Sequence, residues 1–448
     1  MPLVSPSLRA TTFLAALSLP LAAAHADEGM WTFDSFPAAK MRADYGWAPD
    51  QAWLDKVRVA AVRLTGGCSA SFVSDTGLIL TNHHCVAHCV EEHSTAQNNI
   101  LKTGFTARAR EEEKMCAGQQ AEVVTSIKDV TPQVKAAIGS STGEAAVKAR
   151  SAIVAQLENQ GCPDTARNRC QVVSLYGGGQ YKLYTYRKYS DVRLVWAPEA
   201  QAAQFGGDPD NFNFPRYALD ASFLRAYENG KPVSTPAYLQ FNPRAPADGE
   251  AAFVVGNPGS TQRLFTTDQL AMQRELVLPA TVTTYSELRG RLLTAMEADP
   301  AKAREGSDTL FGLENSLKVY IGRTKALNDP AFTRKLADAE AALRAKAASD
   351  PAIGNPWGEI AKATEAYRDI YVPYRFLNTV PRGDLFDYAL DLVRSAEERA
   401  KPNSERLPDY TESRLPLLEK EVLDARPIYP WLERTRLEWA LSKGREYL

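Results

Sequence analysis

All six cysteines of this 448-residue chain lie between residues 68 and 170, and this clustering restricts the fold more than any other feature. The positions are Cys68, Cys85, Cys89, Cys116, Cys162 and Cys170. Six cysteines can pair in many ways, so their number alone does not settle the connectivity. Cys162 and Cys170 flank a short polar stretch, and we expect them to close a small hairpin-like loop as a structural disulfide.

The amino terminus predicts export from the cytoplasm. It carries Arg9, an apolar stretch from Phe13 to Ala24, and then Ala24-His25-Ala26, which fits the small-x-small rule of signal-peptide cleavage. We therefore predict that residues 1–26 are a signal peptide cleaved near Ala26, and that the mature protein is periplasmic or secreted, where disulfides persist. The apolar stretch is shorter than the roughly 20 residues of a transmembrane helix, so no membrane span is expected.

The chain changes character near Phe265. Before this residue, short β-rich runs predict strands at Val57–Leu64, Ala70–Val73, Leu78–Thr81, Tyr181–Val195, Ser222–Tyr227 and Ala251–Val255. Helical spacing interrupts them at residues 130–138 and 143–160. After Phe265, long segments rich in Ala, Leu, Glu, Arg and Lys contain neither Cys nor His. We predict a β domain over residues 27–265 and an all-helical domain over residues 266–448.

Two patterns in the helical half predict local structure. Thr284-x-x-Glu287 has the spacing of a helix capping box. An apolar stripe recurs at i, i+3, i+4, i+7 and i+8, which predicts the buried face of a packed helix. Its members are Leu385, Tyr388, Ala389, Leu392 and Val393.

A hairpin carries the densest chemical signal. Residues 66–73 and 78–85 flank the turn Asp75-Thr76-Gly77, and the second strand ends in Asn82-His83-His84-Cys85. A triad histidine must be held in one tautomer on a rigid strand end. His84 suits that requirement because it directly precedes Cys85, and we interpret His83 as its neighbour.

The same stretch has a metal-binding alternative. It contains i, i+4 pairs that could ligate zinc from one face of a helix, drawn from His84, Cys85, His88, Cys89 and His93. The predicted export weighs against this reading, because oxidised cysteines offer no thiolate ligand and Cys116 is an available partner for Cys89. We expect no metal and no cofactor.

A second motif lies downstream of the hairpin. It is Gly206-Gly207-Asp208-Pro209-Asp210-Asn211-Phe212-Asn213-Phe214-Pro215-Arg216, and it leads to Asp220 and a strand-like run at 221–227. With the hairpin, it resembles the exported bacterial serine dipeptidyl-peptidases of the dipeptidyl-peptidase 7 and 11 type, which belong to the chymotrypsin clan. Further matches are Asp27-Glu28-Gly29-Met30-Trp31 and residues 256–263.

The resemblance implies a mixed β and α fold, in which a chymotrypsin-like β-barrel (partial double barrel) carries a large inserted all-helical domain. It implies a Cys68–Cys85 disulfide, and it assigns His84 and Asp220 to the catalytic triad. Asn211 matches the residue that binds the free amino terminus of the substrate, and Phe212 stands where the best-known members carry Trp. Without the motif, Asp220 reads as a carboxylate paired with Arg216 or Arg225.

No serine turn of the required kind follows a strand. Gly139-Ser140-Ser141-Thr142-Gly143 joins two helical segments, where Ser141-x-x-Glu144 predicts a helix start, and Ser260 is predicted to be structural. The family carries its nucleophile in a second barrel after the helical domain, so we expect that serine beyond Leu448.

The predicted function is release of dipeptides from the free amino terminus of peptides by a serine peptidase. The alternative is a non-catalytic exported protein, either a relic or a peptide-binding module on a peptidase scaffold. The chain carries 52 Lys and Arg against 54 Asp and Glu. This balance gives no indication of nucleic acid as a partner. A homodimer is left open.

Overall fold

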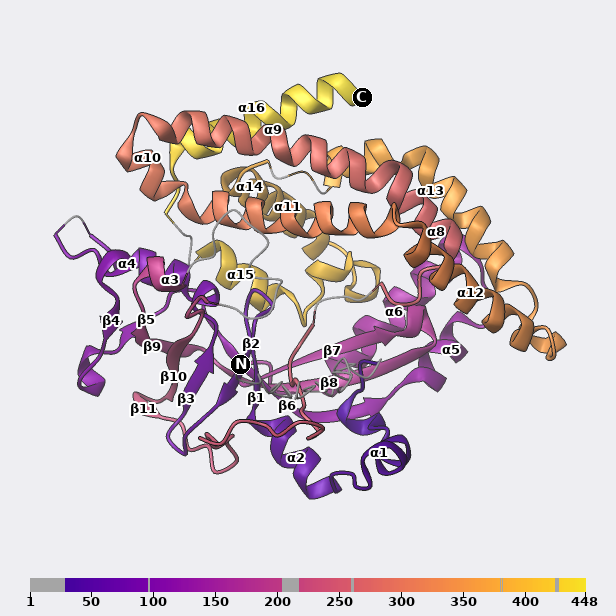
Figure 1. Cartoon of the computed structure of the whole chain (residues 1–448), viewed down its shortest axis with the longest axis horizontal. Coiled ribbons are helices and arrows are strands. Elements are labelled where there is room, and N and C mark those ends of the chain that lie inside the picture. The colour runs from indigo at the N-terminus through magenta and orange to yellow at the C-terminus, as the bar shows by residue number, and fades with distance from the viewer. Residues whose placement is uncertain are drawn as a thin grey trace, which may run out of the picture. The chain divides into compact units, whose positions relative to one another are not determined.

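The computed structural model describes residues 29–95, 97–203, 217–258, 262–378, 380, 382–423 and 427–448 (Figure 1). Contacts divide the chain into two units, one of residues up to Pro49 with Asn242–Phe253, the other of Asp50–Phe241 with Val254–Leu448. In the first unit, the rings of Phe36 and Trp47 pack against Phe253, with centroids 6.1 and 6.3 Å apart. This unit also contains helix α1 (Ala38–Tyr45).

The second unit contains an 11-stranded antiparallel sheet. Its strands are β1 (Ala61–Leu64), β2 (Ser69–Phe72), β3 (Leu78–Thr81), β4 (Phe105–Thr106), β5 (Lys114–Met115), β6 (Ala121–Asp129), β7 (Asn168–Leu175), β8 (Gln180–Tyr189), β9 (Asp191–Ala197), β10 (Ser222–Glu228) and β11 (Lys231–Pro232). The order is β4-β9-β10-β3-β2-β1-β6-β8-β7, with β11 on β10 and β5 on β9. Among the described strands, the ends β4 and β7 do not pair, so the sheet is not closed.

The predicted hairpin is β2 and β3, which pair through Ser71 with Leu80 and Phe72 with Ile79. Its turn requires glycine, because Gly77 has φ +70° and a Cβ there would lie 2.9 Å from the carbonyl oxygen of Ala226. Phe72 and Ile79 point into the core cluster of the sheet, and β3 has the predicted bounds. Local alternation and turn chemistry are therefore sufficient to specify this hairpin.

Three strand predictions are corrected by the structure. Residues 57–60 are the last turn of helix α2 (Gln51–Ala60), because Asp50 caps that helix by accepting the Trp53 N–H, so the strand starts at Ala61. The run Tyr181–Val195 is two strands, β8 and β9, which are separated at Ser190. Residues 251–255 form no strand.

Short helices connect the strands: α3 (Ala87–Glu92), α4 (Ile100–Thr103), α5 (Thr131–Ile138), α6 (Gly143–Gly161) and α7 (Ala200–Ala203). The two predicted helical insertions are α5 and α6. Helix α6 begins at the predicted place, but its N-cap is Thr142 without a side-chain cap bond, so the capping box of Ser141 and Glu144 is wrong. Helix α5 contributes Val134 to a cluster that includes Leu183 of β8 and the Cys162–Cys170 disulfide.

After residue 266 the described chain is helical (Figure 1). The helices are α8 (Thr267–Met272), α9 (Leu278–Glu297), α10 (Pro300–Glu305), α11 (Ser307–Leu327), α12 (Pro330–Ala347), α13 (Pro356–Asn378), α14 (Asp384–Arg399), α15 (Leu415–Leu423) and α16 (Pro430–Tyr447), with a π-helical segment at Gln273–Val277. Their core contains Leu288 and Leu292 of α9, Leu313 of α11 and Trp439 of α16, whose side chain is fully buried. Apolar burial therefore supplies the main stabilisation of this half.

Both local predictions for the helical half are corrected. Thr284 does not cap a helix, because it lies inside α9 and its hydroxyl donates to the Ala280 carbonyl oxygen at 2.7 Å. The stripe of α14 is not a buried face, since Leu385, Leu392 and Val393 are 57, 59 and 58% exposed. Within the described residues, no helix combines the length and apolar character needed to cross a bilayer.

Candidate active site

Two strands bring His84 and Asp220 together. Strand β3 ends at Thr81, and the chain then forms a single 3₁₀ turn over His83–Cys85. Strand β10 runs antiparallel to β3 with Ser222 opposite Thr81. This register places Asp220, two residues before β10, beside the residues that follow β3.

The Asp220 carboxylate contacts His84 at two atoms. Oδ1 accepts the backbone N–H of His84 at 3.0 Å, and Oδ2 lies 2.9 Å from the imidazole Nδ1. The Asp220 side chain is 3% exposed, whereas the His84 side chain is 47% exposed. Because an ionised carboxylate only accepts hydrogen bonds, Nδ1 carries the proton and Nε2 is left as the basic nitrogen.

Asn82 is a part of the site that the sequence analysis did not identify. Its Nδ2 donates to the backbone carbonyl oxygen and to Oδ2 of Asp220, both at 3.0 Å. The amide thereby fixes the same carboxylate oxygen that holds the imidazole. Its position, two residues before a candidate triad histidine, is the signal that could have identified it.

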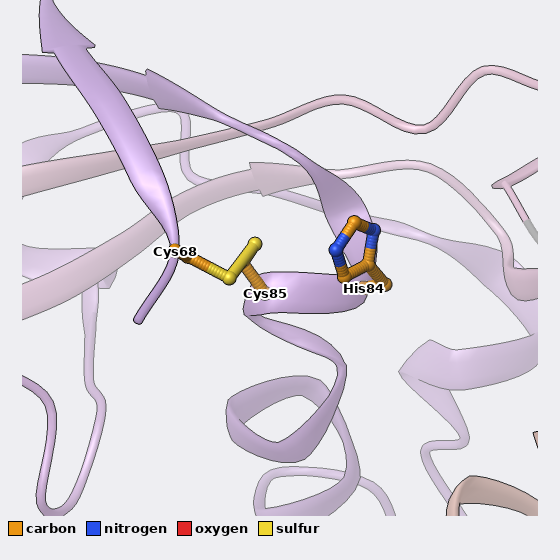
Figure 2. Close-up of side chains that lie close together, drawn as sticks. All are labelled: Cys68, His84 and Cys85. Atoms are coloured by element: carbon orange, nitrogen blue, oxygen red, sulfur yellow. A yellow bond between two sulfur atoms is a disulfide. The ribbon is translucent and has the colours of Figure 1, made fainter. Parts of the chain in front are cut away.

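A disulfide lies beside the histidine. Cys68, just before β2, is bonded to Cys85 with a Cα–Cα distance of 6.1 Å. Figure 2 shows the imidazole of His84 beside this bridge, and its nearest ring nitrogen lies within 4.8 Å of both sulfur atoms. The bridge ties the start of β2 to the turn that carries His84, and this limits the movement of the ring.

Gly256 and Asn257 belong to the segment 256–263, which also resembles the family. They contact the start of β2, which lies beside the end of β3. The backbone N–H of Asn257 donates to the Ser69 hydroxyl at 2.7 Å, and the Thr81 hydroxyl donates to the Ser69 carbonyl oxygen at 3.1 Å. A Cβ at position 256 would lie 2.7 Å from the same hydroxyl, so Gly256 permits this close approach.

His83 is a neighbour of the pair in a different environment. It is 2% exposed, and within the described part of the chain its Nε2 has no hydrogen-bond partner. Burial lowers the pKa of His83, the charge of Asp220 opposes this, and His84 adds to the lowering. Burial therefore favours the neutral imidazole at His83.

The structure tests two alternatives from the sequence analysis, an ion pair of Asp220 with Arg225 and a zinc site. Arg225 bonds to Glu113 at 2.9 Å instead of Asp220. Cys85 and Cys89 both lie in disulfides, Cys68–Cys85 and Cys89–Cys116, so neither offers a thiolate to zinc. Asn211, Phe212, Arg216 and Ser260 lie outside the described residues, and their predicted roles stay predictions. Within those limits, no serine hydroxyl bonds to His84.

Comparisons with known proteins match the chain to one family. Residues 26–448 match the family model described as peptidase S46. The chain is 29% identical to an Asp/Glu-specific dipeptidyl-peptidase of Porphyromonas endodontalis over 79% of this chain and 53% of that protein. It is 27% identical to dipeptidyl-peptidase 7 of Phocaeicola vulgatus over 83% of this chain and 55% of that protein. The chain thus spans about half the length of these relatives.

A solved structure has a similar fold. Porphyromonas endodontalis DPP11 in complex with the dipeptide Arg-Glu superposes with a TM-score of 0.68 at 24% identity, covering 94% of this chain and 64% of that one. The similarity at this level concerns the fold, a large antiparallel sheet accompanied by many helices.

Proposed function

The chain belongs to the peptidase S46 family, and from that membership we propose that it carries the general base and its orienting carboxylate for a serine dipeptidyl-peptidase. His84 is the base and Asp220 the orienting residue. The observation that carries this proposal is the 2.9 Å contact between Nδ1 of His84 and Oδ2 of Asp220, with the carboxylate buried and the imidazole accessible.

In the proposed reaction, His84 carries out two proton transfers. Nε2 of His84 takes the proton of a serine hydroxyl as that oxygen attacks the scissile carbonyl, and the imidazolium then gives the proton to the leaving amine. Asp220 stabilises the imidazolium and Asn82 holds the carboxylate in place. The location of the serine beyond residue 448 stays a prediction of the family resemblance.

The substrate class is proposed to be peptides with a free amino terminus. Asn211 would bind the α-amino group, and Phe212 would provide an apolar wall without the indole N–H of the family tryptophan. The names of the relatives, which are dipeptidyl-peptidases, support release of two residues at a time. A homodimer is compatible with this proposal.

The domain architecture and the cellular location are also proposed from the family resemblance. Residues 27–265 would form the chymotrypsin-like β domain with part of a double barrel, and residues 266–448 a helical domain that covers the cleft. Residues 1–26 would be a signal peptide, and the protein periplasmic or secreted. The three disulfides support a location outside the reducing cytoplasm.

The test is labelling of the purified secreted protein, produced together with the segment beyond residue 448 in which the serine is expected, with a serine-directed fluorophosphonate, followed by mass-spectrometric mapping of the labelled residue. The proposal predicts a labelled serine whose reactivity falls on the order of 10³-fold or more in His84→Ala. His93→Ala is the matched control, because the His93 imidazole bonds to the Met115 carbonyl oxygen at 2.7 Å and takes no part in the His84–Asp220 pair. Absence of labelling, or equal labelling in His84→Ala, favours the non-catalytic alternative.

A further inference from the structure

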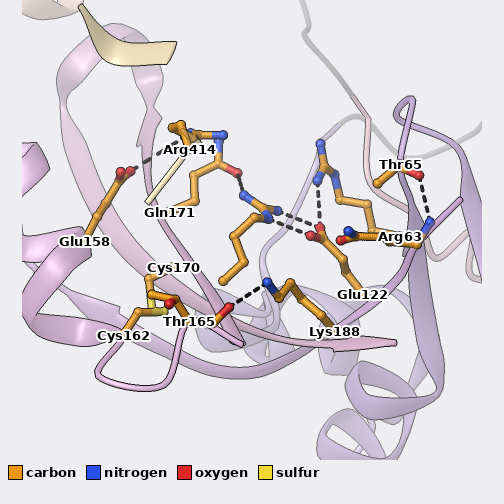
Figure 3. Close-up of polar contacts among 12 residues, drawn as sticks. Arg63, Thr65, Glu122, Glu158, Cys162, Thr165, Cys170, Gln171, Lys188 and Arg414 are labelled. Carbon is orange, nitrogen blue, oxygen red and sulfur yellow. Dashed lines mark hydrogen bonds and ion pairs between the residues drawn. A yellow bond between two sulfur atoms is a disulfide. The ribbon is translucent and has the colours of Figure 1, made fainter. Parts of the chain in front are cut away.

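A buried polar cluster lies on the sheet where β1, β6, β7 and β8 adjoin (Figure 3). Glu122 of β6 has a fully buried side chain and accepts two hydrogen bonds from Arg169 of β7, at 2.6 and 2.7 Å. Arg63 of β1 adds a third at 2.8 Å. Both oxygens of this carboxylate are therefore occupied by guanidinium groups.

The second carboxylate of the cluster is also occupied. Glu158 of α6 accepts the backbone N–H of Val172 at 2.8 Å and the hydroxyl of Ser413 at 2.7 Å. Arg414 lies 4.0 Å from Oε1, the same oxygen that accepts the Val172 N–H. Glu158 thus joins the helix α6 to the segment that precedes α15, with little capacity left for a further cation.

Lys188 of β8 is a cation without a carboxylate partner. Its Nζ donates to the Thr165 carbonyl oxygen at 2.7 Å, and among the described residues no carboxylate lies within ion-pair distance of it. Burial lowers the pKa of Lys188, and it also lowers the pKa of Arg414. The charges of Glu122 and Asp164 act on Lys188 from a longer distance and oppose this lowering.

A small cavity of about 20 Å³ lies beside this cluster. Arg169 and Lys188 line it together with the neutral groups of Gln120, Asn168, Thr165 and Ser413, and no acidic side chain lines it. Arg169 retains N–H groups beyond those given to Glu122 and Gln171. A volume of this size holds roughly one water-sized occupant.

We propose that this cavity binds one small inorganic anion of the size of chloride, held by Lys188 and Arg169. The anion gives Lys188 a negative partner at direct contact inside a cavity that no carboxylate lines, where a half-buried cation otherwise has only the Thr165 carbonyl oxygen. Because Ser413, Pro416 and Leu417 also line the cavity, the bound anion stabilises the attachment of the α15 segment to β7 and β8.

Two measurements on the purified chain test this site. The first is anomalous diffraction from crystals soaked in bromide, for which the proposal predicts a peak in the cavity beside Lys188. The second is the thermal unfolding midpoint in chloride against gluconate at equal ionic strength, where gluconate is too large to enter. Binding of chloride to the folded state predicts a rise of about 2 °C or more.

Variants separate a specific site from general salt effects. Lys188→Met removes one of the two lining cations and is expected to abolish the chloride-dependent rise. Lys148→Met is the matched control, because Lys148 is an exposed residue of α6 paired with Glu144, and it should keep the full rise. A cavity without an anomalous peak, or an equal chloride effect in Lys188→Met, overturns the proposal.

Discussion

The sheet and the helices after residue 266 both have apolar cores, but they differ in what reinforces those cores. In the sheet, three disulfides that span 8 to 27 residues and the Glu122–Arg169 pair join separate elements. In the helices, the described chain has no cysteine, and apolar side chains such as Leu292 and Trp439 fill the core. Covalent and ionic links fix individual side chains, whereas apolar packing fixes whole helices. The residues proposed for chemistry, His84 and Asp220, lie in the first kind of structure.

The largest expected effect is in the helical core. Trp439→Ala should lower the free energy of unfolding by about 3–5 kcal/mol, because it removes a fully buried ring and leaves a cavity. Leu441→Ala on the same helix is the control, since Leu441 is 64% exposed and should change stability by less than about 0.5 kcal/mol. Urea unfolding followed by circular dichroism measures both. Equal losses would mean that α16 is not packed as described.

Removing a disulfide tests the covalent side of the comparison. Cys68→Ala with Cys85→Ala should cost about 3 kcal/mol, and Cys162→Ala with Cys170→Ala about 2.5 kcal/mol, because the loops span 17 and 8 residues. Urea unfolding without reductant measures these losses. A larger loss for the shorter loop would show that native contacts outweigh chain entropy at that bridge.

Acid titration tests the ionic side. Burial alone would raise the pKa of Glu122, but its bonds to Arg169 and Arg63 lower it below 4.5. A carboxylate with a depressed pKa stabilises the fold above its unfolded pKa, and this contribution is lost as pH falls through the folded value. Stability should therefore decline below about pH 4.5, and less steeply in Glu122→Gln. Parallel profiles of the two proteins would contradict the pairing.

The smallest effect is expected on the exposed stripe. Leu392→Ala should change the free energy of unfolding by less than about 0.5 kcal/mol, because that side chain is 59% exposed. Urea unfolding with the same spectroscopic signal as for Trp439→Ala gives the comparison. A loss above about 2 kcal/mol would indicate that the stripe is buried after all, as its periodicity predicts.

These residues also show how far the sequence could be interpreted. The hairpin around Gly77 is specified by alternation and turn chemistry, which are local, and the sequence predicts it correctly. The stripe of α14 shows which face is apolar, but periodicity contains no information about what covers that face. The boundary at residues 57–60 is wrong because a short apolar run fits a strand or a helix, and only the Asp50 cap separates them.

In the candidate site, too, local motifs could be predicted from the sequence, but contacts between distant segments could not. Motifs identify His84 and Asp220, which lie 136 residues apart. Asn82 was missed because its role depends on the register between β3 and β10, and a single sequence does not reveal that register. The roles of Asn211 and Phe212 stay predictions.

The most direct test of the His84–Asp220 arrangement is nitrogen NMR of the imidazole rings at neutral pH, with assignment by His84→Ala. The chain contains five histidines, so the signals can be resolved. The account predicts that neutral His84 carries its proton on Nδ1, and that Asp220→Asn changes this tautomer. A proton on Nε2 in the unmodified protein, or a tautomer unaffected by Asp220→Asn, would contradict the proposed role of this pair.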